Sequence, residues 1–167
     1  MFRIRARVLR LCGMVHRKGK KDAKGAGDEL SYTVIGAAID VHRALGPGLL
    51  ESAYEACLFR ELLLRGVHAD RQVPLPVSYR GARLDCGYRL DLVVEEAIIV
   101  EIKAVSHIKP IHTAQLLTYL RLRHLPLGLL FNFNVVVLRN GLQRVVNELG
   151  DLCVLLAFAV PHLFARA

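Results

Sequence analysis

The chain has 167 residues, which is the length of about one domain and leaves no room for a second one of usual size. Its net charge of +8 is unevenly placed: residues 1–28 hold nine Lys and Arg against two Asp, whereas residues 29–167 hold fourteen against thirteen Asp and Glu. A basic tail is typical of contact with nucleic acid or an anionic surface, but a solvated appendage explains it equally well. Charge alone therefore does not identify the body as a nucleic-acid-binding domain.

Cysteine spacing and apolar runs exclude two further classes. The four cysteines, at positions 12, 57, 86 and 153, have no CxxC spacing, so we expect free buried thiols in a cytoplasmic protein rather than a structural zinc site. The longest apolar candidate, Leu152–Val160, falls short of the roughly 20 residues that a membrane span needs. We predict a basic, disordered N-terminal tail over 1–28, one domain over 29–149 and an apolar C-terminal tail over 150–167.

The predicted elements begin with two helices. Residues 29–45 carry apolar side chains at helical spacing and stop at Gly46-Pro47-Gly48; a second helix covers 51–65 and stops at Gly66. The period then changes to two around Pro74 and Pro76, which predicts an edge strand over 73–77.

The remaining elements alternate between strand and helix. After a turn at residues 80–81, we predict a strand over 83–94 bent at Gly87, a turn at 95–96, a central strand over 97–104, a helix over 110–123, a strand over 127–133, and a short closing strand over 142–146 after a turn at 139–141. The order ααβββαβ(β) predicts a layered α/β fold.

The tripeptide Glu101-Ile102-Lys103 is the first chemical anomaly. Side chains alternate along a strand, so Glu101 and Lys103 point one way while Ile98, Val100 and Ile102 point the other way into the core. Charges on a central strand are costly unless they are paired or bound to a metal. The pattern therefore indicates either a metal site or a buried ion pair.

Asp91 is a second anomaly, on the preceding strand. A tight turn makes the two strands antiparallel neighbours, and counting from that turn brings Asp91 to nearly the height of Glu101. Two adjacent carboxylates repel each other, and a divalent cation such as Mg²⁺ relieves the repulsion. The alternative is a salt-bridged cluster in which Lys103 and Arg89 neutralise the acids.

Two helical pairs are weaker signals. Gln115 and Tyr119 are four residues apart and share a helical face, and Glu51 and Tyr54 share a face of the helix after the Gly turn. Ordinary roles account for all four equally well: a surface Gln, core tyrosines, and a Glu that favours the helix dipole.

Taken together, the motifs resemble the GxxExxY proteins, a bacterial branch of the PD-(D/E)xK nuclease superfamily. The resemblance covers roughly residues 29–148 and rests on GLLESAY at 48–54, HRALGPG at 42–48, RQVPL at 71–75, YRLDL at 88–92, EIKA at 101–104, QLLTYL at 115–120 and NFN at 132–134.

The resemblance implies a restriction-endonuclease-like αβββαβ core with a mixed sheet flanked by helices. It implies that Asp91, Glu101 and the carbonyl of Ile102 bind Mg²⁺ or Mn²⁺, that Glu51 completes the acidic site, and that Lys103 is the catalytic lysine. Gln115 and Tyr119 are similar to the QxxxY helix of the RecB-like branch, where it supports the site. Leu90 stands where the motif has Pro, a position that varies in the superfamily.

The function that follows is a metal-dependent nuclease, with DNA as the expected substrate. A non-catalytic nucleic-acid-binding or regulatory module that keeps the fold is the alternative, because the body is near neutral whereas nuclease grooves are usually positive. A membrane-associated helper that uses both tails is a weaker third reading. A homodimer is left open.

Overall fold

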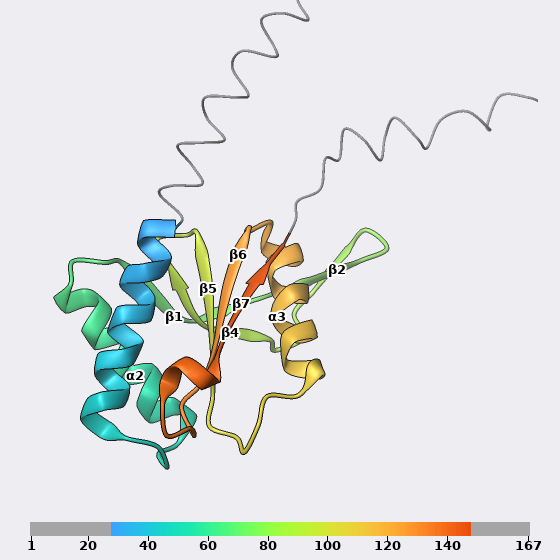
Figure 1. Ribbon diagram of the computed structural model, residues 1–167. Coiled ribbons are helices and arrows are strands. Elements are labelled where there is room, and N and C mark those ends of the chain that lie inside the picture. Colours follow the sequence, from blue (N-terminus) through green and yellow to red (C-terminus); the bar gives the residue numbers. More distant parts are fainter. Residues whose placement is uncertain (1–27, 148–167) are drawn as a thin grey trace, which may run out of the picture.

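The computed structural model describes residues 28–147 as a layered α/β domain (Figure 1). Its helices are an N-terminal helix over residues 28–45, α2 (Glu51–Leu64), α3 (Pro110–Arg123) and the short 3-10 helix η1 (Leu138–Gly141). Its strands are β1 (Ala69–Pro74), β2 (Val77–Tyr79), β3 (Ala82–Leu84), β4 (Arg89–Val94), β5 (Ile98–Lys103), β6 (Leu127–Asn132) and β7 (Leu142–Val146). Both predicted tails lie outside these residues, except that Asp28 is the first residue of the N-terminal helix.

The main sheet has five strands in the order β1-β4-β5-β6-β7. β5 and β6 are parallel and α3 connects them, whereas all other neighbours are antiparallel. The expected central position of β5 is confirmed, and β1 is an edge strand, although it covers Ala69–Pro74 instead of the expected residues 73–77. The order α2-β1-β4-β5-α3-β6 is the expected αβββαβ core, so the predicted fold class is correct.

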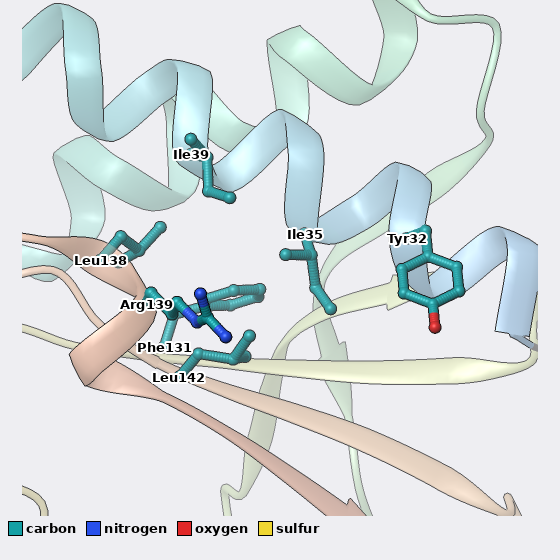
Figure 2. A pocket seen from close by; sticks show the side chains of 7 residues that line it. All are labelled: Tyr32, Ile35, Ile39, Phe131, Leu138, Arg139 and Leu142. Carbon is teal, nitrogen blue, oxygen red and sulfur yellow. The ribbon is translucent and has the colours of Figure 1, made fainter.

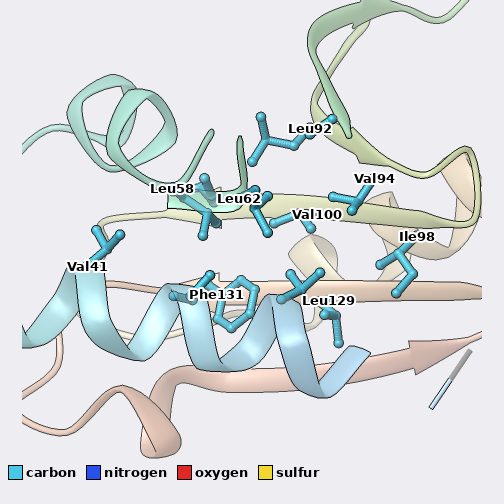
Figure 3. Close-up of a cluster of buried hydrophobic side chains, with 14 of the residues drawn as sticks. Val41, Leu58, Leu62, Leu92, Val94, Ile98, Val100, Leu129 and Phe131 are labelled. Carbon is cyan, nitrogen blue, oxygen red and sulfur yellow. The ribbon is translucent and has the colours of Figure 1, made fainter. Parts of the chain in front are cut away.

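Two apolar layers hold the sheet between helices. The N-terminal helix and α2 pack against one face through residues such as Val41, Leu58 and Leu62 (Figure 3). α3 covers the other face, where Leu116 and Leu120 belong to one buried cluster with Ile99 of β5. A Cβ on Gly128 would lie 2.9 Å from Leu116, so glycine at that position of β6 lets α3 approach the sheet closely.

The sequence prediction fails in one region, between residues 69 and 89. β1 begins at Ala69, earlier than expected, and Val77 belongs to a separate hairpin made by β2 and β3. The strand expected over 83–94 is two strands in different sheets, because Gly87 adopts φ +72° and Asp85 accepts a hydrogen bond from its amide. Gly87 therefore separates two strands at a position where only a bend within one strand was expected.

Candidate active site

Glu101 and Lys103 lie on β5 beneath α3. They share the face of Ile99, whereas Ile98, Val100 and Ile102 belong to the opposite cluster, as strand alternation predicts. Glu101 is 3% exposed, and its Oε1 accepts a hydrogen bond from Lys103 Nζ at 2.6 Å. Within residues 28–147, its other oxygen, Oε2, is the buried side-chain polar atom left without a hydrogen-bond partner.

Asp91 lies where β4 and β5 separate. The register pairs Leu92 with Val100, and Asp91 would come opposite Glu101 one step further. Regular alternation would put Leu90 on the face of Leu92, yet Leu90 packs with Val93 beneath α3, so β4 twists at Asp91. Its carboxylate turns to the β5 backbone, where Oδ2 accepts the Ile102 amide at 2.7 Å.

Three oxygens lie on the β4 side of β5: Asp91 Oδ2, the Ile102 carbonyl oxygen and Glu51 Oε1. The Lys103 carbonyl accepts the Phe133 amide on the β6 side, so the Ile102 carbonyl must point the opposite way, toward β4. Beyond it, the Ala104 amide donates to Glu51 Oε1 at 2.9 Å. The two amides bound by Asp91 and Glu51 are two residues apart, about 7 Å along a strand. The Ile102 carbonyl therefore lies between two carboxylates.

Burial and like charge disturb the titration of this cluster. Burial is the main cause that raises the pKa of Asp91 to about 7, and the nearby charge of Glu101 adds to it. Burial also raises the pKa of Glu101, against the opposing effect of Lys103. For Lys103, burial would lower the pKa, but its hydrogen bond to Glu101 and the surrounding carboxylates raise it overall. Asp91 is therefore only partly ionised at neutral pH, because burial and the neighbouring Glu101 disfavour a second negative charge in the cluster.

The Gly48-x-x-Glu51-x-x-Tyr54 motif fixes the start of α2. The buried Tyr54 hydroxyl donates to the Gly46 carbonyl at 2.6 Å and accepts the Leu49 amide at 3.1 Å. Its ring stacks on Phe133, with centroids 4.4 Å apart. Tyr54 is therefore a core residue that holds the Gly-Pro-Gly loop, and Glu51 begins α2 at the end of β5.

Gln115 and Tyr119 lie on α3, over the face of Glu101 and Lys103. Gln115 donates a hydrogen bond to the Tyr119 hydroxyl. Burial raises the pKa of Tyr119, and the charges of Glu101 and Lys103 also act on it, so the phenol lies near the acidic cluster. Tyr119 is only 5% exposed and belongs to the same buried cluster as Leu116, so it contributes to the core beneath α3.

Sequence reasoning missed a network around Glu55. This residue of α2 is 5% exposed and accepts hydrogen bonds from Arg71 Nε at 2.9 Å and Gln72 Nε2 at 2.7 Å. Gln72, at φ +51°, interrupts the β1–β4 register, which pairs its neighbours Arg71 and Val73 with Leu92 and Leu90. Non-glycine residues with a strained, positive φ are often found near functional sites. The only sequence signal was an acid four residues after Glu51 on a helix that must be half-buried.

Asn132, at the end of β6, fixes the loop that follows β5. Its side chain donates to the Val105 carbonyl and accepts the amides of Val105 and Asn134. His42 similarly bonds the Val135 carbonyl at 2.8 Å. These motif residues hold the loops around the site and do not enter the acidic cluster.

The structure forms no complete metal cage on its own. In the part of the chain from 28 to 147, no group of three or more His, Cys, Asp and Glu side chains is arranged to hold an ion. An apolar pocket lies on the other face of the sheet, between the N-terminal helix and η1 (Figure 2). It is lined by Tyr32, Ile35, Ile39, Phe131, Leu138, Arg139 and Leu142 and so contains none of the site residues.

A family model described as the PD-(D/E)XK nuclease superfamily matches residues 28–145, well over half of the chain. No curated protein matches significantly, and no solved structure does. None of the helices within residues 28–147 is long and apolar enough to span a bilayer.

Proposed function

The chain belongs to the PD-(D/E)XK nuclease superfamily, and from this premise we propose that its site hydrolyses phosphodiester bonds of nucleic acid with a divalent cation, DNA being the expected substrate. One observation carries the proposal: the buried, unpartnered Oε2 of Glu101 beside the carboxylate of Asp91. A folded protein rarely keeps such an atom without a purpose, because an unmade hydrogen bond in the interior is costly.

The donor set fits Mg²⁺ or Mn²⁺. Both cations prefer carboxylate and carbonyl oxygens, and an ion there would partner Glu101 Oε2 and relieve its repulsion with Asp91. We propose that Asp91, Glu101 and the Ile102 carbonyl would hold it, with Glu51 helping through a water or a second ion. When bound, such an ion polarises a phosphate and lowers the pKa of a water.

Lys103 is the residue that would act on the reacting groups. Its ion pair with Glu101 raises its pKa, so Lys103 stays a protonated ammonium and does not serve as a neutral base. As an ammonium it would orient the attacking water or stabilise developing negative charge. Tyr119 and Gln115 would keep bulk water from the α3 side of the cluster. Their position supports the likeness to the RecB-like QxxxY helix.

The GxxExxY branch is the subgroup that we infer within the superfamily. The support is structural: Gly46 and Gly48, with φ +68° and +106°, form the turn that Tyr54 holds, and Glu51 follows directly. Each residue of the motif thus has a physical reason to stand where it does.

A non-catalytic binding module is the second candidate. It is favoured by the Lys103–Glu101 ion pair, which neutralises one acid without any cation, and by the lack of a complete cage within residues 28–147. In that case the cluster would be structural, and nucleic acid would bind without turnover.

Cleavage assays with matched variants separate the two candidates. Single- and double-stranded DNA and RNA are incubated with the full chain in Mg²⁺, Mn²⁺ or chelator. We expect metal-dependent cleavage that Asp91→Asn abolishes. Asp70→Asn, an exposed position on β1, removes the same charge elsewhere and should cleave normally. Wild-type protein that binds these substrates but cleaves none of them in either metal would establish the binding module instead.

A further inference from the structure

The β2–β3 hairpin, with the residues that follow it before β4, forms an arm over residues 77–88. It is a two-stranded sheet separate from the main one, and it extends from the body beside α3 (Figure 1). Of the residues that the structure describes, none from 76–89 belongs to either core cluster. An isolated hairpin is only marginally stable in water, and the core gains little from this one. Its side chains are therefore free to serve a partner.

The base of the arm adjoins the candidate site. The chain leaves it through Tyr88 and Arg89, directly before Leu90 and Asp91. The Tyr88 ring lies 6.3 Å from the ring of Tyr119, whose phenol is influenced by the charges of Glu101 and Lys103. A ligand that lies along the arm would therefore end beside Tyr119 and the start of β4, the strand that carries Asp91.

The exposed chemistry of the arm is aromatic and basic. Tyr79 is 60% exposed and Tyr88 49% exposed. The guanidinium of Arg80 lies over the Tyr79 ring, 5.4 Å from its centroid. Residues 77–88 hold two arginines, Arg80 and Arg83, against one aspartate, whereas the site itself is acidic. A polyanion therefore meets favourable charge on the arm before it meets the carboxylates.

Backbone strain at the tip gives independent support. Arg80 and Gly81 occupy the turn with φ +48° and +81°, values typical of a type I′ hairpin turn. Asn-Gly is the favoured pair in such a turn, because a long side chain at positive φ is strained. A strained arginine at an exposed tip is better explained by what it binds than by what it stabilises.

We propose that this arm binds a single-stranded segment of nucleic acid, with Tyr79 and Tyr88 stacking on unpaired bases and Arg80 and Arg83 contacting phosphates. The proposal rests on the function proposed above and names the form of its substrate. Unpaired bases offer their faces to aromatic rings, whereas bases in a duplex already stack on each other. A ribbon that reads a duplex groove instead needs polar side chains aimed at base edges.

Binding without cleavage tests the arm separately from the chemistry. The full chain is titrated in chelator against fluorescein-labelled single-stranded DNA and RNA and against the matched DNA duplex, and fluorescence anisotropy is followed at several salt concentrations. We expect tighter binding of the single strands. Tyr79→Leu, which keeps an apolar side chain but removes the ring, should weaken that binding about five-fold or more.

Arg80→Asn is the sharper variant, because it improves the turn while it removes the charge. The melting temperature should stay equal or rise, whereas the affinity for single strands should fall. The plot of log association constant against log salt concentration should become shallower by about 0.7 for one lost phosphate contact. Arg60→Ala removes the same charge from an exposed position on α2 and should change the affinity less.

Two results would overturn the proposal that the arm binds single strands: a wild-type protein that prefers the duplex, or arm variants that bind single strands as tightly as wild type does. Failure of the proposed function is a different result. If the protein binds single strands through the arm but never cleaves them, the arm proposal stands and the nuclease proposal fails. If both arm variants cleave subsaturating single-stranded substrate at the wild-type rate, only the arm proposal fails.

Discussion

The carboxylate of Asp91 accepts the backbone amide of Ile102, with 2.7 Å between Oδ2 and N. The β4–β5 register, continued past Leu92 and Val100, would pair Ile102 with Leu90 instead. A side chain thus replaces a strand hydrogen bond, and the two strands part at this point. The same separation leaves the Ile102 carbonyl beside two carboxylates, so the arrangement that ends the strand pairing also forms the acidic site.

The stability of the metal-free protein should fall as pH rises from about 4 to about 7. The pKa of Asp91 is raised from 3.8 to about 7 in the fold, chiefly by burial, and that of Glu101 is raised as well. Between those limits the folded state binds more protons than the unfolded state, so the free energy of unfolding decreases with pH. The penalty is absent below about pH 4 and complete above about pH 7.

Melting temperatures measured in chelator across that range test the pH dependence. Asp91→Asn should flatten the decrease, whereas Asp70→Asn should leave it as in wild type. Added Mn²⁺ should raise the melting temperature of wild type more at about pH 8 than at about pH 5, because the cation binds ionised carboxylates. A wild-type profile that is flat or rises with pH would contradict the buried, repelling pair.

Tyr54→Phe should destabilise the domain by about 1–2 kcal/mol, because the Gly46 carbonyl and the Leu49 amide lose their partner. The ring still stacks on Phe133, so the core keeps its packing. Cleavage should fall as well, since Glu51 depends on the start of α2. Chemical denaturation measures the loss of unfolding free energy, with Tyr79→Phe at an exposed position as the control. Equal stabilities of the two variants would show that the Tyr54 hydroxyl does not stabilise the Gly-Pro-Gly loop.

Glu55→Gln should cost about 2 kcal/mol of unfolding free energy, because an amide at this buried position turns a donor toward Gln72 and loses the ion pair with Arg71. Adding Gln72→Glu restores an acceptor opposite the new amide and should recover part of the loss. A double variant no more stable than Glu55→Gln alone would show that Glu55 acts through Arg71 only.

The sequence predicted those parts of the fold in which local signals agree with tertiary contacts. Pro110 and the leucines of α3 give its bounds as found, and strand alternation gives the common face of Glu101 and Lys103. The arm escaped prediction because the alternating pattern runs through Gly87 without interruption. Glu55 escaped because its partners Arg71 and Gln72 come 16 and 17 residues later, and no local pattern joins them.

Deletion of residues 1–27 should leave the melting temperature nearly unchanged. Asp28 must be kept, because it begins the N-terminal helix and its Oδ1 lies 2.6 Å from Arg144 Nη2. The deleted segment carries nine Lys and Arg, so the salt dependence of nucleic-acid binding should become shallower. Calorimetry and salt titrations check the two parts, and a fall of several degrees in melting temperature would show that the segment packs on the domain.

Lys103→Arg is the most demanding test of the chemistry. The charge and an ion pair with Glu101 can both survive, so a purely structural lysine should tolerate the change with little loss of stability or activity. A compact ammonium that positions water or stabilises the reacting phosphate cannot be replaced by a larger planar group that carries its charge differently. We therefore expect the cleavage rate to fall by about 10²-fold or more while the melting temperature stays close to wild type. Lys109→Arg, the same change at the exposed N-cap of α3, is the matched control and should cleave normally. A Lys103→Arg protein that cleaves at the wild-type rate would assign Lys103 to the ion pair alone and leave catalysis to the carboxylates and their cation.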